Sequence, residues 1–152
     1  MRSRLLLDLQ WNITGQTPQW PLSRPRIRRL LEASLGAQAE GATITIRLVG
    51  TREGRSLNRD YRDKDYATNV LTFGYESHPV VVADLVLCLP VLVREARSQK
   101  KALDAHFAHM LVHGMLHAQG FDHLEDQEAE EMESIERRIM RRFRLPDPYS
   151  VH

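Results

Sequence analysis

Residues 43–49 have the sequence TITIRLV, in which β-branched and leucine side chains recur with the two-residue period of a strand. This is the clearest strand signal in the chain. Working outward, weaker signals of the same kind predict a strand before it and two after it, over residues 5–11, 70–73 and 80–89. The sheet therefore has about four strands.

Helical patterns separate or follow these strands. Ser23 is a suitable N-cap for a helix over residues 21–35 that ends near Gly36. The remaining predicted helices cover residues 52–61, 91–98, 103–118 and 125–142. Helical crossovers join parallel strands, so we predict an α+β fold of the α/β-sandwich type, with a mixed, mostly parallel sheet. Residues 1–152 are expected to form one domain.

Composition excludes several classes of protein. The chain has 152 residues, of which 42% are hydrophobic and 27% charged, as in folded soluble domains. No apolar run approaches the roughly 20 residues of a membrane span, and the apolar start is too short for a signal peptide. The single cysteine, Cys88, excludes an internal disulfide and favours a reducing, cytoplasmic location. No membrane partner is expected.

The basic residues are unusual in kind rather than in number. The net charge is only +1, yet just three of the 21 basic residues are lysine. The guanidinium group of arginine binds phosphate in a bidentate manner, which suits nucleic acid. A GC-rich genome would explain the same bias toward arginine equally well, so both explanations stay open.

The strongest chemical signal is HGMLHAQGFDH, residues 113–123. His113 and His117 are four residues apart on a predicted helix, so their rings share one face. Gly120 is expected to end that helix and let the chain turn back, which would bring His123 to the same point. Three imidazoles with an open fourth position are typical of a catalytic zinc site. We therefore predict one Zn²⁺ bound by His113, His117 and His123.

Two neighbouring residues have less certain roles. His109 lies one turn before His113 and either supports a ligand or is an ordinary helix histidine. Asp122 either orients a ligand imidazole or is a turn residue.

The spacing of the histidines matches the metzincin zinc proteases, which have the pattern His-Glu-x-x-His-x-x-Gly-x-x-His. The glutamate of that pattern is the general base, and here its position is Gly114. Glycine cannot accept a proton from a metal-bound water, which argues against a metallopeptidase.

A second polar stretch is LNRDYRDKD, residues 57–65, followed by TNVLTF, residues 68–73. Arg59, Arg62 and Lys64 are candidates for binding RNA phosphates, and Arg62 for stabilising charge in a phosphoryl transition state. A surface salt-bridge cluster with the interleaved aspartates is the alternative.

These motifs together resemble the YbeY family of bacterial rRNA-maturation metalloendoribonucleases. The resemblance rests on the histidine motif, the Tyr-Arg-x-Lys-Asp loop and three shorter stretches: ADLVLC (83–88), DQEAEEM (126–132) and DPY (147–149). It covers most of the chain. The departures are mild. They include Gly74 in place of a proline and a short connection over residues 74–80, which affects substrate contacts there rather than the metal site.

The resemblance implies a zinc-dependent endoribonuclease that is specific for single strands. Such an enzyme matures the 3′ end of small-subunit rRNA and takes part in ribosome quality control. Its partners would be single-stranded RNA, rRNA and the small ribosomal subunit, with no role for DNA. His113, His117 and His123 would be the zinc ligands, and Arg62 the functionally important arginine; His113 and Arg62 would act in catalysis.

Two alternatives to this function stay open at the level of sequence. One is the metallopeptidase. The other is a non-catalytic ribosome-assembly factor in which zinc only stabilises the C-terminal half. The oligomeric state does not follow from the sequence.

Overall fold

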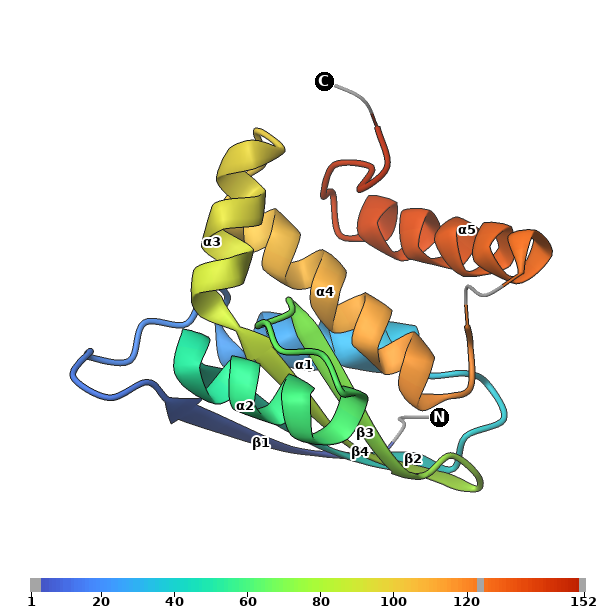
Figure 1. Ribbon diagram of the computed structural model, residues 1–152. Coiled ribbons are helices and arrows are strands. Elements are labelled where there is room, and N and C mark those ends of the chain that lie inside the picture. The colour runs from blue at the N-terminus through green and yellow to red at the C-terminus, as the bar shows by residue number, and fades with distance from the viewer. Residues whose placement is uncertain (1–3, 123–124, 151–152) are drawn as a thin grey trace.

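The computed structural model describes residues 4–122 and 125–150. Its centre is β2 (Gly41–Val49), the strand with the clearest sequence signal. β2 pairs in parallel with β1 (Arg4–Asn12) on one side and with β4 (Val80–Cys88) on the other (Figure 1). β3 (Val70–Glu76) pairs antiparallel with β4, which gives the order β1-β2-β4-β3. The predicted mixed, mostly parallel sheet of an α+β fold is confirmed.

Helical connections produce the parallel pairs. α1 (Arg24–Ser34) joins β1 to β2, and α2 (Thr51–Arg62) follows β2. Ser23 is the N-cap of α1, as predicted, and its Oγ accepts a hydrogen bond from the Arg26 amide at 3.4 Å. β3 and β4 instead form a hairpin. This is why β3 is longer than the predicted strand, which ended at residue 73: the pairing with β4 continues to Glu76 through a register shift.

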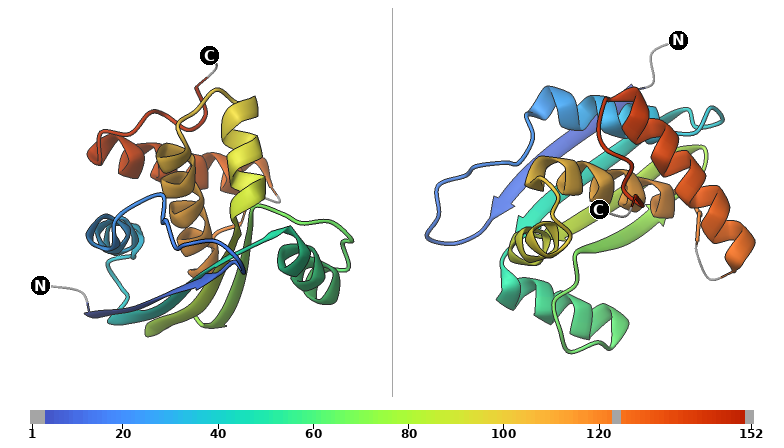
Figure 2. Two further views of the ribbon diagram at one scale, coloured as in Figure 1. Left: turned by 90° about the vertical axis from the view of Figure 1, so that its left-hand side faces the viewer. Right: turned by 90° about the horizontal axis from the view of Figure 1, so that it is seen from above.

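Three helices complete the chain: α3 (Leu89–Ser98), α4 (Leu103–Ala118) and α5 (Asp126–Arg142). α4 lies on one face of the sheet between α1 and α3, and α5 packs across α4 on the side away from the sheet (Figure 2). Gly120 ends the turn after α4 with a left-handed φ of 97°, as predicted for a helix-terminating glycine.

α4 is the centre of the hydrophobic core. Phe107, Leu111 and Met115 are fully buried, because neighbouring elements surround the helix on most sides. Gly114 allows close approach to the sheet: a Cβ there would lie 3.2 Å from Leu85 Cδ2 and 3.4 Å from Val70 Cγ2. The packing therefore fixes the rotation of α4 about its axis, and with it the direction of the histidine face.

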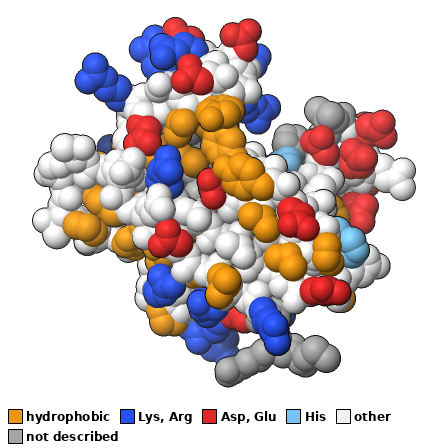
Figure 3. All heavy atoms as spheres, turned by 90° about the horizontal axis from the view of Figure 1, so that it is seen from below, with side chains coloured by type: hydrophobic (Ala, Val, Ile, Leu, Met, Phe, Trp, Pro, Cys, Tyr) orange, Lys and Arg blue, Asp and Glu red, His pale blue; other side chains and the backbone are white. Residues whose placement is uncertain are grey.

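α2 covers only part of the opposite face of the sheet. Its inner side closes a small second core, in which Gly54 lies against the buried Cys88. The rest of this face carries mixed hydrophobic and charged side chains (Figure 3). Tyr61, Tyr66 and Tyr75 are exposed large side chains of the molecule. Among the described residues, no helix has the length and apolarity that a membrane crossing requires.

Candidate metal centre

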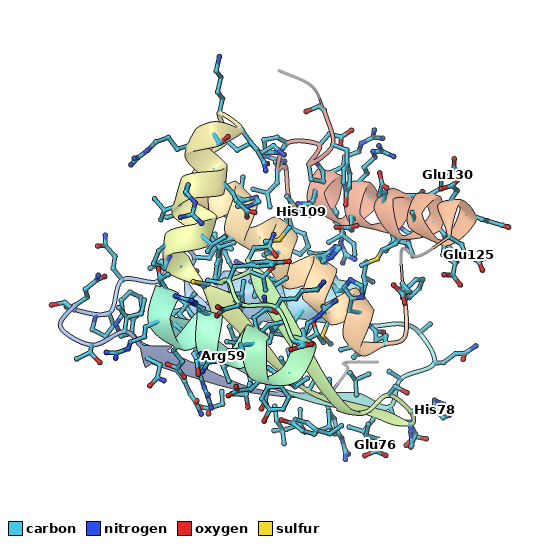
Figure 4. The ribbon with its side chains drawn as sticks, viewed as in Figure 1. Arg59, Glu76, His78, His109, Glu125 and Glu130 are labelled. Atoms are coloured by element: carbon cyan, nitrogen blue, oxygen red, sulfur yellow. The ribbon has the colours of Figure 1, made fainter. Side chains whose placement is uncertain are left out.

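His109, His113 and His117 lie on one face of α4, at successive four-residue intervals. Their rings form a continuous row, with centroids 6.1 Å apart for the first pair and 4.5 Å apart for the second. α5 packs over this part of α4, and His109 lies between the two helices (Figure 4). Helix geometry thus produces the row, and the docking of α5 determines what faces it.

His113 and His117 point the same ring atom at one place. The two Nε2 atoms are 3.1 Å apart. Two nitrogens bound to one tetrahedral zinc at 2.0–2.1 Å would be about 3.3 Å apart, so only a small adjustment separates this pair from a ligand pair. The predicted pairing of these two histidines is present in the structure, and the donor set suits zinc.

A carboxylate that the sequence analysis did not select lies behind the row. Glu136, in the middle of α5, has no exposed surface. Its Oε2 is 2.5 Å from His109 Nε2 and 3.3 Å from His113 Nδ1. Its Oε1 accepts a 2.8 Å hydrogen bond from the hydroxyl of Tyr149, near the C-terminus. One buried side chain therefore joins α4, α5 and the C-terminal segment.

The electrostatics of this group are consistent with an ionised glutamate. Burial alone would raise the pKa of Glu136, but hydrogen bonds and charge attraction from His109 and His113 lower it to about 2. Burial lowers the pKa of His109, which outweighs the opposing effect of Glu136. Burial raises the pKa of Tyr149, and the negative charge of Glu136 adds to that shift. At neutral pH we assign a carboxylate that accepts from the N–H and O–H donors around it.

The tautomer of His113 follows from these contacts. An ionised carboxylate only accepts hydrogen bonds, so the Nδ1 of His113 carries the proton that faces Glu136. Its Nε2 then carries the unprotonated lone pair of the ring, and that atom lies 3.1 Å from His117 Nε2. His113 is thus set up to bind a metal through Nε2.

His109, His113 and Glu136 also form a potential metal-binding group, because their ligand atoms lie within 4.8 Å of one another. A metal site in this part of α4 is therefore supported by two overlapping sets of donors that share His113. Neither set by itself defines the identity of the metal.

The other predicted ligands and supporting residues have different outcomes. His123 lies outside the described residues. Asp122 is half-buried in the turn after Gly120, close in sequence to α4. His109 is part of the site, through Glu136 rather than through His117. His106, also in α4, is buried with its Nε2 2.9 Å from Glu95 Oε1.

The basic candidates come from α2 and the residues that follow it. Arg59 and Arg62 are in the last turn of α2 and Lys64 follows it, and all three are exposed. No hydrogen bond or ion pair joins them to a histidine within residues 4–122 and 125–150. In Figure 4, Arg59 lies on α2 and His109 lies between α4 and α5. Among the described residues, direct contacts therefore do not join the basic residues to the histidine row.

Glu136 and Tyr149 are the two site residues that sequence reasoning missed. The available signal was the position of Glu136 within the apolar stripe of α5, between the buried Met132 and Met140. A charge at such a position needs buried partners. Glu136 did not stand out in the sequence because α5 and its N-cap contain many exposed acids. Glu125, the N-cap, and Glu130 are two of these, and both point to solvent in Figure 4.

Fold and site together define a class: an α+β protein with a histidine-rich helix and a buried carboxylate arranged as a candidate metal centre. A family model described as Endoribonuclease YbeY matches residues 15–144. The chain belongs to this endoribonuclease YbeY family.

Individual relatives agree over almost the whole chain. The protein named Endoribonuclease YbeY from Methylibium petroleiphilum is 54% identical over 149 residues, which is 98% of this chain and 97% of the relative. The one from Albidiferax ferrireducens is 55% identical over 151 residues, 98% of this chain and all of the relative. The solution structure of TM1509 from Thermotoga maritima aligns with a TM-score of 0.60 at 20% identity, covering 95% of this chain and 99% of that one, which supports the fold.

Proposed function

We propose that this chain is a zinc-dependent, single-strand-specific endoribonuclease that acts in small-subunit rRNA 3′-end maturation and ribosome quality control. Residues 1–152 would form a single catalytic domain that works on the small ribosomal subunit in the cytoplasm. The observation that carries the proposal is the 3.1 Å approach of His113 Nε2 to His117 Nε2, in a member of the endoribonuclease YbeY family.

His113, His117 and His123 would hold the zinc. When bound, zinc supplies Lewis acidity that polarises a phosphate oxygen or activates an attacking hydroxyl. His113 and His117 contribute fixed lone pairs, because the packing of Gly114 against Leu85 sets the rotation of α4. Few rearrangements are then needed when the metal binds.

Arg62 would offset the negative charge that develops on the phosphate during cleavage. It is exposed in the last turn of α2, beside Arg59 and Lys64, which would contact the RNA backbone. A flexible single strand can follow both the basic residues and the histidine row, whereas a stiff duplex would have to deform to do so.

The position of Gly114 argues further against a metallopeptidase. A side chain at this residue would point at Leu85 and Val70 of the sheet. It would not face the open side of the histidine row. Position 114 therefore lacks the proton acceptor of a metzincin-type mechanism. A side chain placed there would also point at the sheet and not at the open side of the histidine row.

The test uses a single-stranded RNA oligonucleotide labelled at its 5′ end. Wild type, His117→Ala and Arg62→Ala are compared with and without a chelator. Two matched controls are His78→Ala, in the exposed β3–β4 turn, and Arg52→Ala, in the exposed first turn of α2. We expect cleavage to disappear in His117→Ala and with chelator, to fall strongly in Arg62→Ala, and to persist in both controls.

Equal cleavage in every variant would indicate a contaminating nuclease and overturn the proposal. RNA binding without zinc-dependent cleavage would favour the non-catalytic assembly factor. The end groups identify the attacking oxygen: a 2′,3′-cyclic phosphate requires attack by the substrate 2′-hydroxyl. A duplex of the same sequence should be cleaved far more slowly than the single strand.

A further inference from the structure

Glu136 has two alternative roles that the structure can distinguish. As a member of the group with His109 and His113, it could be a direct metal ligand. As a hydrogen-bond acceptor, it could instead hold the ring of His113 while another atom of that ring binds the metal. The two roles require different distances between the donor atoms.

The distances favour the hydrogen-bonding role. Ligand atoms that each lie about 2.0–2.2 Å from one tetrahedral ion are about 3.3 Å or more apart. His109 Nε2 and Glu136 Oε2 are only 2.5 Å apart, which is the separation of a strong hydrogen bond and leaves no room for an ion between them. The contact between His113 Nδ1 and the same oxygen, at 3.3 Å, has hydrogen-bond length as well.

Both oxygens of Glu136 are engaged in the same way. Oε2 accepts from the two histidines, and Oε1 accepts from the Tyr149 hydroxyl at 2.8 Å. A fully buried carboxylate is stable only when such donors replace water. The set of donors therefore fixes the orientation of the carboxylate.

We propose that Glu136, held by His109 and Tyr149, is a positioning residue that orients His113 for metal binding through Nε2. This inference rests on the proposed zinc site. Carboxylates that hydrogen-bond to a ligand imidazole select its tautomer and increase its basicity. Here the carboxylate comes from α5, so the docking of α5 on α4 prepares the metal site.

The C-terminal segment is part of this arrangement. Lys101 Nζ donates to the carbonyl of Pro148 at 2.5 Å, and Arg137 Nε lies 3.4 Å from Asp147 Oδ1. The Arg137 guanidinium also lies over the Tyr149 ring, 5.2 Å from its centroid. These contacts hold the tyrosine against Glu136. Residues 147–149 thus reach the metal site through Tyr149, whose hydroxyl donates to Glu136 and whose ring centroid lies 5.3 Å from that of His109.

The test measures zinc affinity by competition with a chromophoric chelator, without reference to RNA cleavage. The variants are Glu136→Gln and Tyr149→Phe, with Glu130→Gln as the matched control on the exposed side of α5. A glutamine accepts through one oxygen only, so its amide group faces one of the donors. We expect about 10- to 100-fold weaker zinc binding in Glu136→Gln, by analogy with other outer-shell partners of metal-bound histidines.

Tyr149→Phe should weaken zinc binding less than Glu136→Gln does, and Glu130→Gln should not change it. Cobalt in place of zinc provides a second measurement, since its visible absorption reports on the geometry of the ligands. We expect that spectrum to shift in Glu136→Gln while one metal still binds per chain. Circular dichroism of the metal-free variants controls for folding, and Tyr149→Phe tests the proposal should Glu136→Gln fail to fold.

Two results would overturn the positioning role. Unchanged affinity and an unchanged cobalt spectrum in both variants would show that Glu136 does not influence the metal. Loss of the bound metal from a folded Glu136→Gln, as complete as in His117→Ala, would show that Glu136 is itself a ligand. In both cases wild type still binds zinc, so the proposed function survives. Wild type that binds no zinc would instead refute the proposed function and this inference together.

Discussion

The two polar regions of this protein are built in opposite ways. Between α4 and α5, Glu136 is fully buried and three side-chain donors surround its carboxylate. Along α2 and the loop after it, the charges are in water: the side chain of Arg59 is 55% exposed and its nearest acid, Asp60, is 3.6 Å away. Both regions contain the residue types of an active site, but only the first has fixed geometry.

This difference matches the chemistry that we assign to each region. Metal ligands must lie within a few tenths of an ångström of their ideal positions, so they benefit from a buried, hydrogen-bonded surround. Contacts with an RNA backbone tolerate variation, because phosphates recur along a flexible strand. Even so, a hydrogen bond anchors the backbone of the loop after α2. The buried Asn58 donates through Nδ2 to the carbonyl of Tyr66 at 2.7 Å.

The largest effect should come from removing the buried charge. Glu136→Ala leaves the donors of His109 and Tyr149 without an acceptor and opens space beneath α5. We expect the free energy of unfolding of the metal-free protein to fall by about 1–3 kcal/mol for each donor left unpaired, measured by urea titration. Glu130→Ala, on the exposed side of the same helix, should stay within about 0.5 kcal/mol of wild type. Equal losses in both variants would contradict the contrast between the two regions.

The next effect separates chemistry from metal binding. Arg62→Ala should reduce kcat for RNA cleavage by about 100-fold, the order found when one charge-stabilising donor is removed. Zinc affinity should not change, because among the described residues no hydrogen bond or ion pair links Arg62 to the histidine row. Chelator competition measures the affinity and single-turnover cleavage measures the rate, with Arg52→Ala as control. A parallel loss of zinc would place Arg62 in the metal region instead.

The histidine pair could be predicted from sequence because it depends on one helix. A four-residue spacing brings His113 and His117 together whatever surrounds them, and the structure places their Nε2 atoms 3.1 Å apart. The order of elements and the mixed sheet were predictable for a similar reason, since strand and helix periods are local. Ser23 and Gly120, which mark helix ends, belong to the same class of signal.

Glu136 was not predictable in this way, because its role depends on how α5 docks on α4. The sequence around it is a run of acids and arginines that is typical of a solvated helix, and most of that helix is exposed. The length of β3 also depends on a partner, since residues after Phe73 extend the strand only through pairing with β4. In both cases contacts between distant segments overrode the local pattern.

A smaller effect concerns the inner side of α2. Cys88 is buried against Gly54, and burial raises the pKa of its thiol. We expect native protein to resist alkylation by iodoacetamide at neutral pH, and urea-unfolded protein to react fully, as measured by mass spectrometry. Rapid labelling of folded protein would mean that α2 opens readily. The anchored backbone of this region would then be less fixed than the structure indicates.

The smallest effect is expected for the most conspicuous ion pair of the basic region. Arg55 donates to both oxygens of Asp65, at 2.8 and 2.9 Å, and this raises the pKa of the arginine and lowers that of the aspartate. Both side chains are more than half exposed, so water and salt screen their attraction. Asp65→Asn should therefore leave the midpoint of thermal unfolding unchanged, at low salt and at high salt alike. A clear destabilisation that disappears at high salt would show that charge pairing orders this loop. Both polar regions would then have fixed geometry, and they would differ only in how deeply their charges are buried.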